Sequence, residues 1–416
     1  MAPPGGMPSG RDVGSRPAVA VFPFIAGNHP LAAELDALRA LIAFDAGLAA
    51  HAQPGTLVHR EIRAAPDGTA RRRLARFYWS VQAPDPAAPG GLRGRMLLLD
   101  ARLTGGEPAM YDFPADPGVP AAARADSPLV AGGAVGVRVL RYIPLRRITF
   151  YDGAPGGGEP VVGKIKRRTS TESAHARLTD VWRAVERSPG GFAVPAPKGV
   201  DLDRGVQYQQ AMPGRPLVAE LTLERADAAM ERFGAIHAEL HQLPVDAPAV
   251  EEAQRRALAE DADWVGFAAP EQREAVDRVH AWVARRVAGM PPAATAYCHG
   301  DLSPSQVLVS GDTWTVVDFD DAHRGDAYLE IGAVLAGMAR EGAAEEPLDP
   351  ATAERLEAAY LAGYRARSGR PIDEPRLHVR RVEAGIRQLA TRLRKGRALP
   401  GEAERCVGRL LELTGA

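Results

Sequence analysis

A small set of polar residues in the last third of the chain could perform chemistry together. In chain order they are His299-Gly300-Asp301, Gln306 and Asp318-Phe319-Asp320. The apolar stretches 307–309 and 314–317 between them predict two antiparallel strands joined by a tight turn. Because a hairpin brings its two open ends together, we expect Asp301, Gln306 and Asp318 to converge at one end of it.

These residue types suit the transfer of a phosphoryl group. Mg²⁺ prefers oxygen ligands, so the Asp318 carboxylate and the Gln306 amide oxygen are candidate metal ligands, with Asp320 as a further metal contact. Asp301 stands five residues before Gln306, where it could accept the proton of an attacking hydroxyl. His299 is expected to orient the loop by hydrogen bonds. The spacing matches the catalytic and metal-binding motifs of kinases, in which positioning and charge neutralisation do most of the work.

The paired motifs resemble those of the aminoglycoside phosphotransferase and choline kinase superfamily. Gln306 stands where that family usually has Asn, and this variant resembles the maltokinase-like and aminosugar-kinase-like branch. The resemblance implies an α+β, protein-kinase-like bilobal fold. It also implies ATP as donor, Mg²⁺ as cofactor, and a hydroxyl of a sugar, amino sugar or aminoglycoside-like molecule as acceptor. Without the resemblance, the motifs could be a Gly-Asp turn and an exposed acidic loop.

Three predicted strands, over 136–142, 147–152 and 161–166, suggest the small lobe of such a fold. By resemblance, Lys164 on the third strand holds the nucleotide phosphates, with Lys166 as the alternative on the same face. The connection between the first two strands contains no glycine, so Arg147 or Arg146 is the candidate phosphate contact there. The glycine-rich run 153–158 joins the second and third strands and is not expected to touch nucleotide.

Two further elements are implied to position the nucleotide. Thr169-Ser170-Thr171-Glu172 has the pattern of a capping box and predicts a helix to about residue 186. Glu172 and Glu186 are the candidate acids that would orient the lysine. The strand that ends near residue 210 resembles the hinge that binds adenine, with contacts expected from Gln210 to Met212.

The remaining chain predicts four regions. They are a disordered N-terminus (1–17), an N-terminal cap subdomain (18–130), the kinase-like small lobe (131–212) and a mostly helical C-terminal lobe with the catalytic loop (213–416). The cap is predicted to contain a helix over 30–53 and antiparallel strands over 56–63, 71–82 and 92–103. The stretch 112–127, rich in Pro and Asp, predicts a linker.

Helical spacing predicts helices over 226–242, over 261–288 with a break near Pro270, and over 328–340, 351–367, 376–395 and 402–413. His237 and His241 lie one turn apart and could bind zinc, but no acid is expected near them and a histidine near a helix C-terminus is favourable anyway. Asp326 and Glu330 are expected to brace the catalytic loop.

The acceptor is the least determined part of the prediction. An acidic run could hold a cationic acceptor, although a solvated helix face is the favoured explanation for such a run. It comprises Glu341, Glu345, Glu346, Asp349, Glu354 and Glu357. A kinase acting on Ser or Thr of a natural-product precursor peptide is an alternative, as is a non-catalytic nucleotide-binding scaffold.

Composition is that of an ordinary globular protein. The 416 residues carry a formal net charge of −1, so no strong field would attract nucleic acid or an anionic membrane. The Gly- and Pro-rich start lacks a signal-peptide core, and two cysteines make a disulfide framework improbable. We therefore expect a cytoplasmic enzyme with no nucleic-acid or membrane partner, and the sequence leaves its oligomeric state open.

Overall fold

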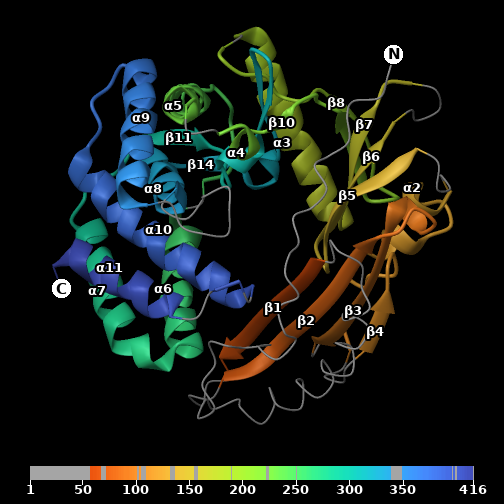
Figure 1. Ribbon diagram of the computed structural model, residues 1–416, viewed down its shortest axis with the longest axis horizontal. Helices are drawn as coiled ribbons and strands as arrows, with labels where there is room; N and C mark the ends of the chain where they lie inside the picture. Colours follow the sequence, from red (N-terminus) through yellow and green to blue (C-terminus); the bar gives the residue numbers. More distant parts are fainter. Residues whose placement is uncertain are drawn as a thin grey trace. The chain divides into compact units, whose positions relative to one another are not determined.

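The computed structural model of the chain describes most of its residues (Figure 1). They are 57–66, 72–100, 103–104, 109–131, 136–153, 158–188, 190–221, 224–249, 251–338, 349–395, 397–398 and 401–415. They divide into two compact units, which are described separately below. One unit takes its described residues from Met1–Gly153, Lys164–Arg167 and Leu393–Pro400, and the other from Ala154–Gly163, Arg168–Arg392 and Gly401–Ala416.

The first unit contains a four-stranded antiparallel sheet in the order β1-β2-β3-β4. Its strands are β1 (Leu57–Pro66), β2 (Arg72–Pro84), β3 (Leu92–Asp100) and β4 (Ala109–Asp112). The three predicted strands are confirmed and a fourth is added. Tyr78, Met96 and Leu98 form a buried cluster with Leu145. The predicted N-terminal disorder (1–17) and the helix over 30–53 lie outside the described residues.

The prediction of a linker over 112–127 is wrong. This stretch folds into the short 3₁₀-helix η2 (Pro120–Ala123) followed by α2 (Pro128–Ala131), and Asp116 within it is buried. Asp116 accepts hydrogen bonds from the Tyr142 hydroxyl (2.9 Å) and the Leu145 amide (2.7 Å). Burial raises the pKa of Asp116 although these hydrogen bonds act to lower it. Pro and Asp here build a packed turn that composition alone does not distinguish from a solvated connection.

A five-stranded sheet has the order β5-β6-β7-β9-β8. Its strands are β5 (Val137–Ile143), β6 (Arg147–Asp152), β7 (Val161–Ile165), β8 (Pro197–Asp201) and β9 (Val206–Gln210). The three predicted strands with a lysine in the third are confirmed. The connection between β5 and β6 is a tight turn in which Leu145 is buried and adopts a φ of 62°. The Leu145 amide is held by Asp116, so that carboxylate fixes the turn.

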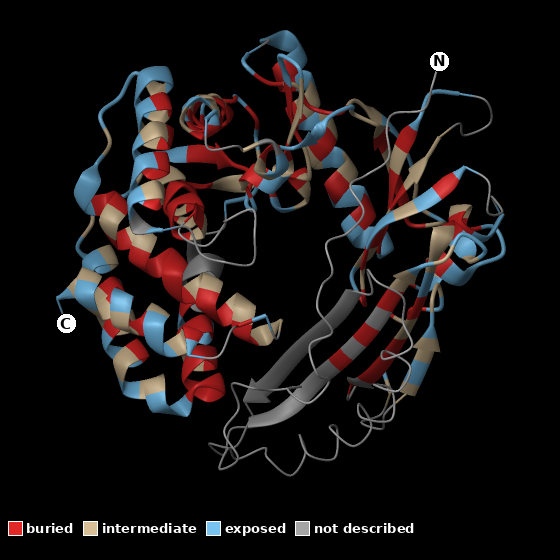
Figure 2. Ribbon diagram, viewed as in Figure 1, coloured by how far each residue is buried: buried red, intermediate tan, exposed pale blue. Residues whose placement is uncertain are grey.

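Helices dominate the second unit. They are α3 (Arg168–Arg187), α4 (Leu217–Glu220), α5 (Ala226–His241), α6 (Glu251–Ala268), α7 (Arg273–Ala288), α8 (Ala327–Met338), α9 (Pro350–Ser368), α10 (Glu374–Arg394) and α11 (Glu402–Thr414). The 3₁₀-helix η4 (Pro270–Gln272) separates α6 from α7, which confirms the predicted break. Buried positions gather on α8 and along one side of α3 and α10 (Figure 2).

Helix α3 starts differently from its prediction. It begins at Arg168, one residue before Thr169, the expected cap. Thr171 is buried and its hydroxyl donates to the Gly205 carbonyl at 3.0 Å. The Ser/Thr-rich pattern therefore docks the helix on the β8–β9 turn instead of closing its end.

Short strands hold the catalytic segments in the second unit. β12 (Val307–Ser310) pairs with β13 (Thr313–Val316) and with β10 (Arg215–Pro216), while β11 (Thr295–Cys298) pairs with β14 (His323–Asp326). The predicted hairpin is thus confirmed. Tyr297, Val307 and Val316 are buried in the large apolar core of this unit, so the segments that carry the candidate chemistry are anchored in packed side chains.

Two helices approach unusually closely because a glycine on each faces the backbone of the other. α5 packs along α9 (Figure 1). A Cβ on Gly234 of α5 would lie 2.0 Å from the Tyr360 carbonyl oxygen, and one on Gly363 of α9 would lie 1.8 Å from the Glu231 carbonyl oxygen. Any side chain at either position would push the two backbones apart.

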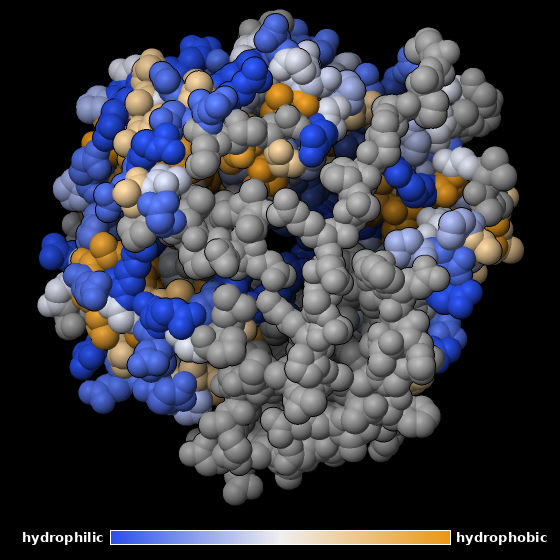
Figure 3. All heavy atoms as spheres, in the orientation of Figure 1, coloured by the Kyte–Doolittle hydropathy of each residue, from blue (hydrophilic) through white to orange (hydrophobic). Residues whose placement is uncertain are grey.

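On the face shown in Figure 3, polar and charged residues cover much of the described surface and apolar residues form small scattered patches. Among the described residues, no helix is long and apolar enough to cross a membrane.

Candidate active site

The loop that carries Asp301 and the segment that carries Asp318 meet at the open end of the β12–β13 hairpin. Val307 pairs with Val316, and the Val317 amide donates to the Gln306 carbonyl at 2.9 Å. Gln306 ends the 3₁₀-helix η5 (Pro304–Gln306), and Asp318 directly precedes η6 (Phe319–Asp321). The convergence predicted from the hairpin is therefore present in the structure.

His299 ties the two segments together. One ring nitrogen, Nε2, lies 2.9 Å from the Val317 carbonyl oxygen, to which it donates, and Nδ1 accepts from the Asp301 amide at 3.3 Å. The ring also packs against Phe319, with 4.8 Å between the ring centroids. His299 is fully buried, so these contacts hold the backbone of Asp301 and not its exposed carboxylate.

Backbone geometry brings the two segments into direct contact. Gly300 has a φ of 89°, and a Cβ there would lie 2.3 Å from the Asp321 carbonyl oxygen. Asp318 itself adopts a left-handed conformation, with a φ of 72°. Such a conformation is uncommon for a residue other than glycine and turns the chain sharply after β13.

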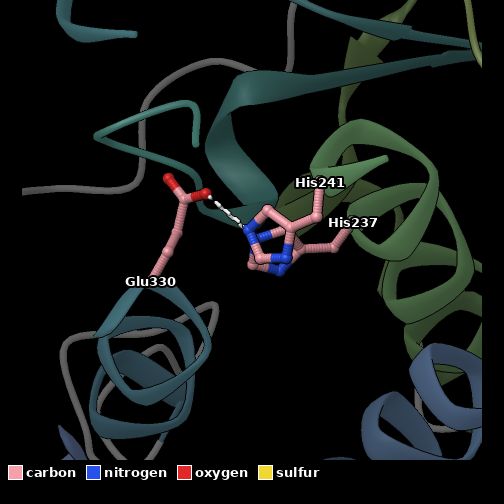
Figure 4. A group of neighbouring side chains, drawn as sticks. All are labelled: His237, His241 and Glu330. Atoms are coloured by element: carbon pink, nitrogen blue, oxygen red, sulfur yellow. Dashed lines mark hydrogen bonds and ion pairs between the residues drawn. The ribbon is translucent and has the colours of Figure 1, made fainter. Parts of the chain in front are cut away.

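Glu330 on α8 supports the catalytic loop from behind. Its carboxylate accepts hydrogen bonds from the amides of His299 (3.1 Å) and Gly300 (2.6 Å), and from Nε2 of His237 (3.1 Å) and of His241 (3.0 Å). Figure 4 shows how the two histidines reach from α5 toward this side chain. The expectation that Glu330 braces the loop is confirmed.

Hydrogen bonds favour the ionised form of this buried acid. Burial alone would raise the pKa of Glu330, but the hydrogen bonds from His237 and His241 outweigh it and hold that pKa well below its usual range. A carboxylate that accepts several hydrogen bonds stays ionised even in the protein interior.

Two tyrosines complete the network. The Tyr360 hydroxyl lies 2.5 Å from Nδ1 of His237, and the Tyr364 hydroxyl lies 2.8 Å from Nδ1 of His241. Neutral histidines that donate from Nε2 and accept at Nδ1 satisfy every one of these contacts. Burial lowers the pKa of His237 to about 4, which agrees with a neutral ring.

The expectation that no acid lies near the two histidines is wrong. Nε2 of His237, Nε2 of His241 and a Glu330 oxygen lie within 4.8 Å of one another, close enough for a metal. Sequence spacing does not reveal this, because Glu330 comes from a different helix. The same atoms already bond to each other and to two backbone amides, so the arrangement is complete as a hydrogen-bonded brace.

Arg177 is a site contact that sequence reasoning missed. Its guanidinium, on α3, donates to the Asp320 carbonyl at 2.7 Å. It therefore fixes the backbone of the segment that carries Asp318 and Asp320. The only sequence signal was its position on the helix predicted to orient the nucleotide lysine.

Asp326 has a different role from the predicted one. It caps α8 by accepting from the Tyr328 amide at 3.0 Å, and it pairs with Arg376 (3.3 Å) and Arg380 (2.9 Å) of α10. Among the described contacts it therefore holds α10 against α8, whereas bracing of the catalytic loop falls to Glu330.

A pocket of about 520 Å³ opens beside Asp301. Its walls come from the catalytic loop, from α8 and from α10, which supplies Arg387, Gln388, Thr391 and Arg392. Gln388 is anchored by a hydrogen bond from its side-chain amide to the Ala333 carbonyl of α8 at 2.7 Å. The volume falls within the range typical of small-molecule sites.

The other predicted site residues lie as follows. Lys164 on β7 and Lys166 just after it are both buried, and Arg147 begins β6. Gln210 ends β9, where its amide donates to the Ala196 carbonyl (2.8 Å), and Met212 follows as a half-buried residue. Glu172 and Glu186 are both exposed, which does not distinguish between them.

Two of the predicted surface features lie largely outside the described residues. They are the centre of the glycine-rich run (154–157) and three members of the acidic run, Glu341, Glu345 and Glu346. Of the described acids, Asp349 caps α9 through the Thr352 amide (3.0 Å), and Glu357 pairs with Arg381 (2.6 Å).

Comparison with known proteins decides the family. Residues 148–404 match the family described as APH, the phosphotransferase enzyme family. The chain belongs to this family. It is therefore a kinase that transfers a phosphoryl group to a hydroxyl, and the aminoglycoside phosphotransferase resemblance is confirmed, although the branch within the superfamily stays a prediction. No curated protein matches the chain.

Solved structures agree on the fold. A thermostable mutant of aminoglycoside phosphotransferase APH(4)-Ia, in complex with ADP and hygromycin B, is 14% identical with a TM-score of 0.51, over 68% of this phosphotransferase and 94% of that chain. Amicoumacin kinase hAmiN is 15% identical (TM-score 0.49; 67% and 88% covered). A choline/ethanolamine kinase family protein from Mesorhizobium loti is 18% identical (TM-score 0.48; 70% and 92% covered). The first similarity supports the predicted α+β, kinase-like fold.

Proposed function

We propose that this phosphotransferase moves the γ-phosphoryl group of ATP to a hydroxyl of a small molecule, with Mg²⁺ as cofactor and a sugar-like compound as acceptor. The observation that carries the proposal is the junction of two carboxylate-bearing loops beside a bounded pocket. The Asp301 loop and the Asp318 segment are joined through His299, and the pocket of about 520 Å³ lies on the Asp301 side.

In this mechanism Asp301 orients the acceptor hydroxyl and takes its proton as the new bond forms. The acceptor oxygen bonds to the γ-phosphorus while the bond from that phosphorus to the β,γ-bridging oxygen breaks, so the products are a phosphate monoester and ADP. The proton passes from Asp301 to solvent. His299 and Glu330 keep the loop in place without touching the substrates.

Asp318 and Gln306 supply the oxygen donors that suit Mg²⁺, and we assign the ion to them, with Asp320 as a further contact. Bound Mg²⁺ neutralises charge on the transferring phosphate. Gln306 keeps the carbonyl oxygen of the usual Asn on a chain that is one methylene longer. The chemistry of this donor set fits the ion.

The nucleotide contacts are proposed from the family resemblance. Lys164 would hold the phosphates, with Arg147 as a further contact and Gln210 and Met212 at the adenine. Because the Gln210 and Ala211 amides donate to the carbonyls of Ala196 and Pro160, we assign the adenine hydrogen bond to the Met212 amide. The β1–β4 sheet is proposed to be the cap subdomain, and we propose a cytoplasmic location, where ATP is available.

Turnover tests this proposal. Purified full-length protein should release ADP from Mg-ATP when a suitable hydroxylated acceptor is added, and the phosphorylated acceptor should appear in equal amount by ³¹P NMR. Asp301→Asn should abolish transfer while ATP still binds. If the protein binds Mg-ATP but transfers to no acceptor in a broad panel of sugars and hydroxylated peptides, the scaffold interpretation is correct. If peptides alone accept phosphate, the small-molecule assignment is wrong.

A further inference from the structure

The charge of the pocket beside Asp301 bears on the chemical class of the acceptor. Besides Asp301, two carboxylates line it, Asp326 and Glu330. Asp326 already pairs with Arg376 and Arg380. Glu330 accepts its four hydrogen bonds from two histidines and two backbone amides. Neither is available to hold an ammonium group without giving up contacts that maintain the fold.

The wall formed by α10 has the opposite sign. Arg387 and Arg392 both line the pocket, five residues apart on α10, with Gln388 and Thr391 between them. Their acidic partners lie elsewhere: Glu383 is 2% exposed and Glu402 is 7% exposed, and neither belongs to the described pocket lining. The pocket is therefore bordered by two guanidinium groups whose ion-pair partners Glu383 and Glu402 do not line it.

The acidic partners also hold these arginines rigidly. Arg387 donates to Glu383 at 2.7 Å. Arg392 makes a two-point contact with Glu402, at 2.5 Å from Nε and 2.9 Å from Nη2. A guanidinium that is fixed before binding loses less side-chain freedom when it meets a ligand, and its planar fork matches a carboxylate or a phosphate.

We propose that the acceptor carries an anionic group, a carboxylate or a phosphate, in addition to the hydroxyl that is phosphorylated. Arg387 and Arg392 bind this group, while Gln388 and Thr391 bind neighbouring hydroxyls and Asp301 takes the reacting one. The inference rests on the proposed function and narrows its acceptor to acidic, sugar-like molecules. It disfavours polycationic acceptors, which would place ammonium groups against guanidinium groups in a partly buried site.

Direct binding tests the inference independently of turnover. The full-length protein, saturated with Mg²⁺ and AMP-PNP, would be titrated by calorimetry with glucose, glucosamine, glucuronate and glucose 6-phosphate. At least one of the two anionic sugars should bind tenfold or more tightly than glucose, and glucosamine should bind no better than glucose. Comparison of glucuronate with glucose 6-phosphate separates a carboxylate from a phosphate. Equal binding of all four, absence of binding by both anionic sugars, or preference for glucosamine overturns the inference.

Variants of α10 sharpen the test. Arg392→Gln and Arg387→Gln should each weaken binding of the preferred anionic sugar at least tenfold and leave glucose binding unchanged. Arg392→Lys keeps the charge opposite Glu402 and should lose less, which covers the case in which Arg392→Gln fails to fold. Arg381→Gln is the matched control, because Arg381 lies on the same helix and pairs with Glu357 but does not line the pocket. Equal losses in all three arginine-to-glutamine variants would refute the assignment.

The outcomes for the two proposals are distinguishable. If anionic sugars bind through Arg387 and Arg392 but no phosphoryl transfer occurs, the proposed function fails and the binding inference stands. If Asp301-dependent transfer occurs but neutral or cationic acceptors bind best, the proposed function stands and the binding inference fails.

Discussion

Replacement of Glu330 by glutamine should damage both stability and catalysis, because one buried carboxylate supports the loop that carries Asp301. Glutamine has nearly the same shape but only one acceptor oxygen. With that oxygen facing the amide of His299, the new NH₂ group faces the Gly300 amide, which donates to Glu330 at 2.6 Å in the native protein. Two donors would then oppose each other in the interior.

The size of the effect follows from this geometry. An unsatisfied buried donor costs about 1–3 kcal/mol. The three remaining hydrogen bonds lose their charged acceptor, which weakens each of them by roughly 1 kcal/mol. Glutamine is neutral, so the variant no longer has a buried charge to desolvate, and this offsets part of that loss. The free energy of unfolding should therefore fall by about 2–5 kcal/mol, or roughly 5–15 °C in Tm. This is a large share of the ~5–15 kcal/mol typical of a domain, so the variant should fold but be fragile.

The catalytic effect has a separate origin. Without its hydrogen bond to Glu330, the Gly300 amide no longer fixes the start of the catalytic loop. A displacement of about 1 Å at a catalytic group costs on the order of 100-fold in rate. We expect kcat for phosphoryl transfer to fall roughly 10- to 100-fold at a temperature where the variant is folded, with KM for ATP changed less than about twofold.

Two controls separate these effects. Asp301→Asn should abolish transfer and leave Tm unchanged, because the Asp301 side chain is exposed. Glu239→Gln changes a glutamate of α5 that, like Glu330 of α8, accepts a hydrogen bond from a backbone amide, that of Gly191 at 2.6 Å, but lies far along the chain from the catalytic loop. It should lower Tm and leave kcat unchanged. Wild-type Tm and kcat in Glu330→Gln, or an equal loss of kcat in Glu239→Gln, would refute the reasoning.

Three further predictions concern residues around the same loops. Burial lowers the pKa of His237 from 6.5 to about 4, so between these pH values the unfolded chain holds a proton that the folded chain lacks. The free energy of unfolding, measured by urea titration, should therefore be at its maximum above about pH 6.5 and fall by up to about 3 kcal/mol toward pH 4. This fall should be smaller in His237→Gln. Arg177→Ala should loosen the backbone of Asp320 and raise the Mg²⁺ concentration needed for half-maximal activity several-fold. A fall in kcat with no change in that Mg²⁺ concentration would contradict this prediction. Gln306→Asn should retain activity with an altered Mg²⁺ requirement, and an unchanged metal dependence would count against Gln306 as a ligand.

Local patterns predicted the catalytic hairpin well and the surroundings of the site poorly. The strands before Asp318 and after Gln306 are apolar, short and separated by a turn, so neighbouring residues alone fix their pairing. Asp116 shows the limit of such reasoning. Its stretch has the composition of a solvated linker, but Tyr142 and Leu145 supply the contacts that bury it, and they lie more than 25 residues further along the chain.

The sequence by itself determined the reaction class, because the identities and spacing of His299, Asp301, Gln306 and Asp318 all lie within 20 consecutive residues on one hairpin. Only the tertiary structure decided what supports the hairpin and what faces it. Glu330 of α8 meets His237 of α5, and the glycines of α5 and α9 let those two helices approach closely. Helix α10 brings Arg387 and Arg392 to the Asp301 side. Contacts of this kind join helices that are distant along the chain. They depend on how helices pack, which no local pattern of residues encodes.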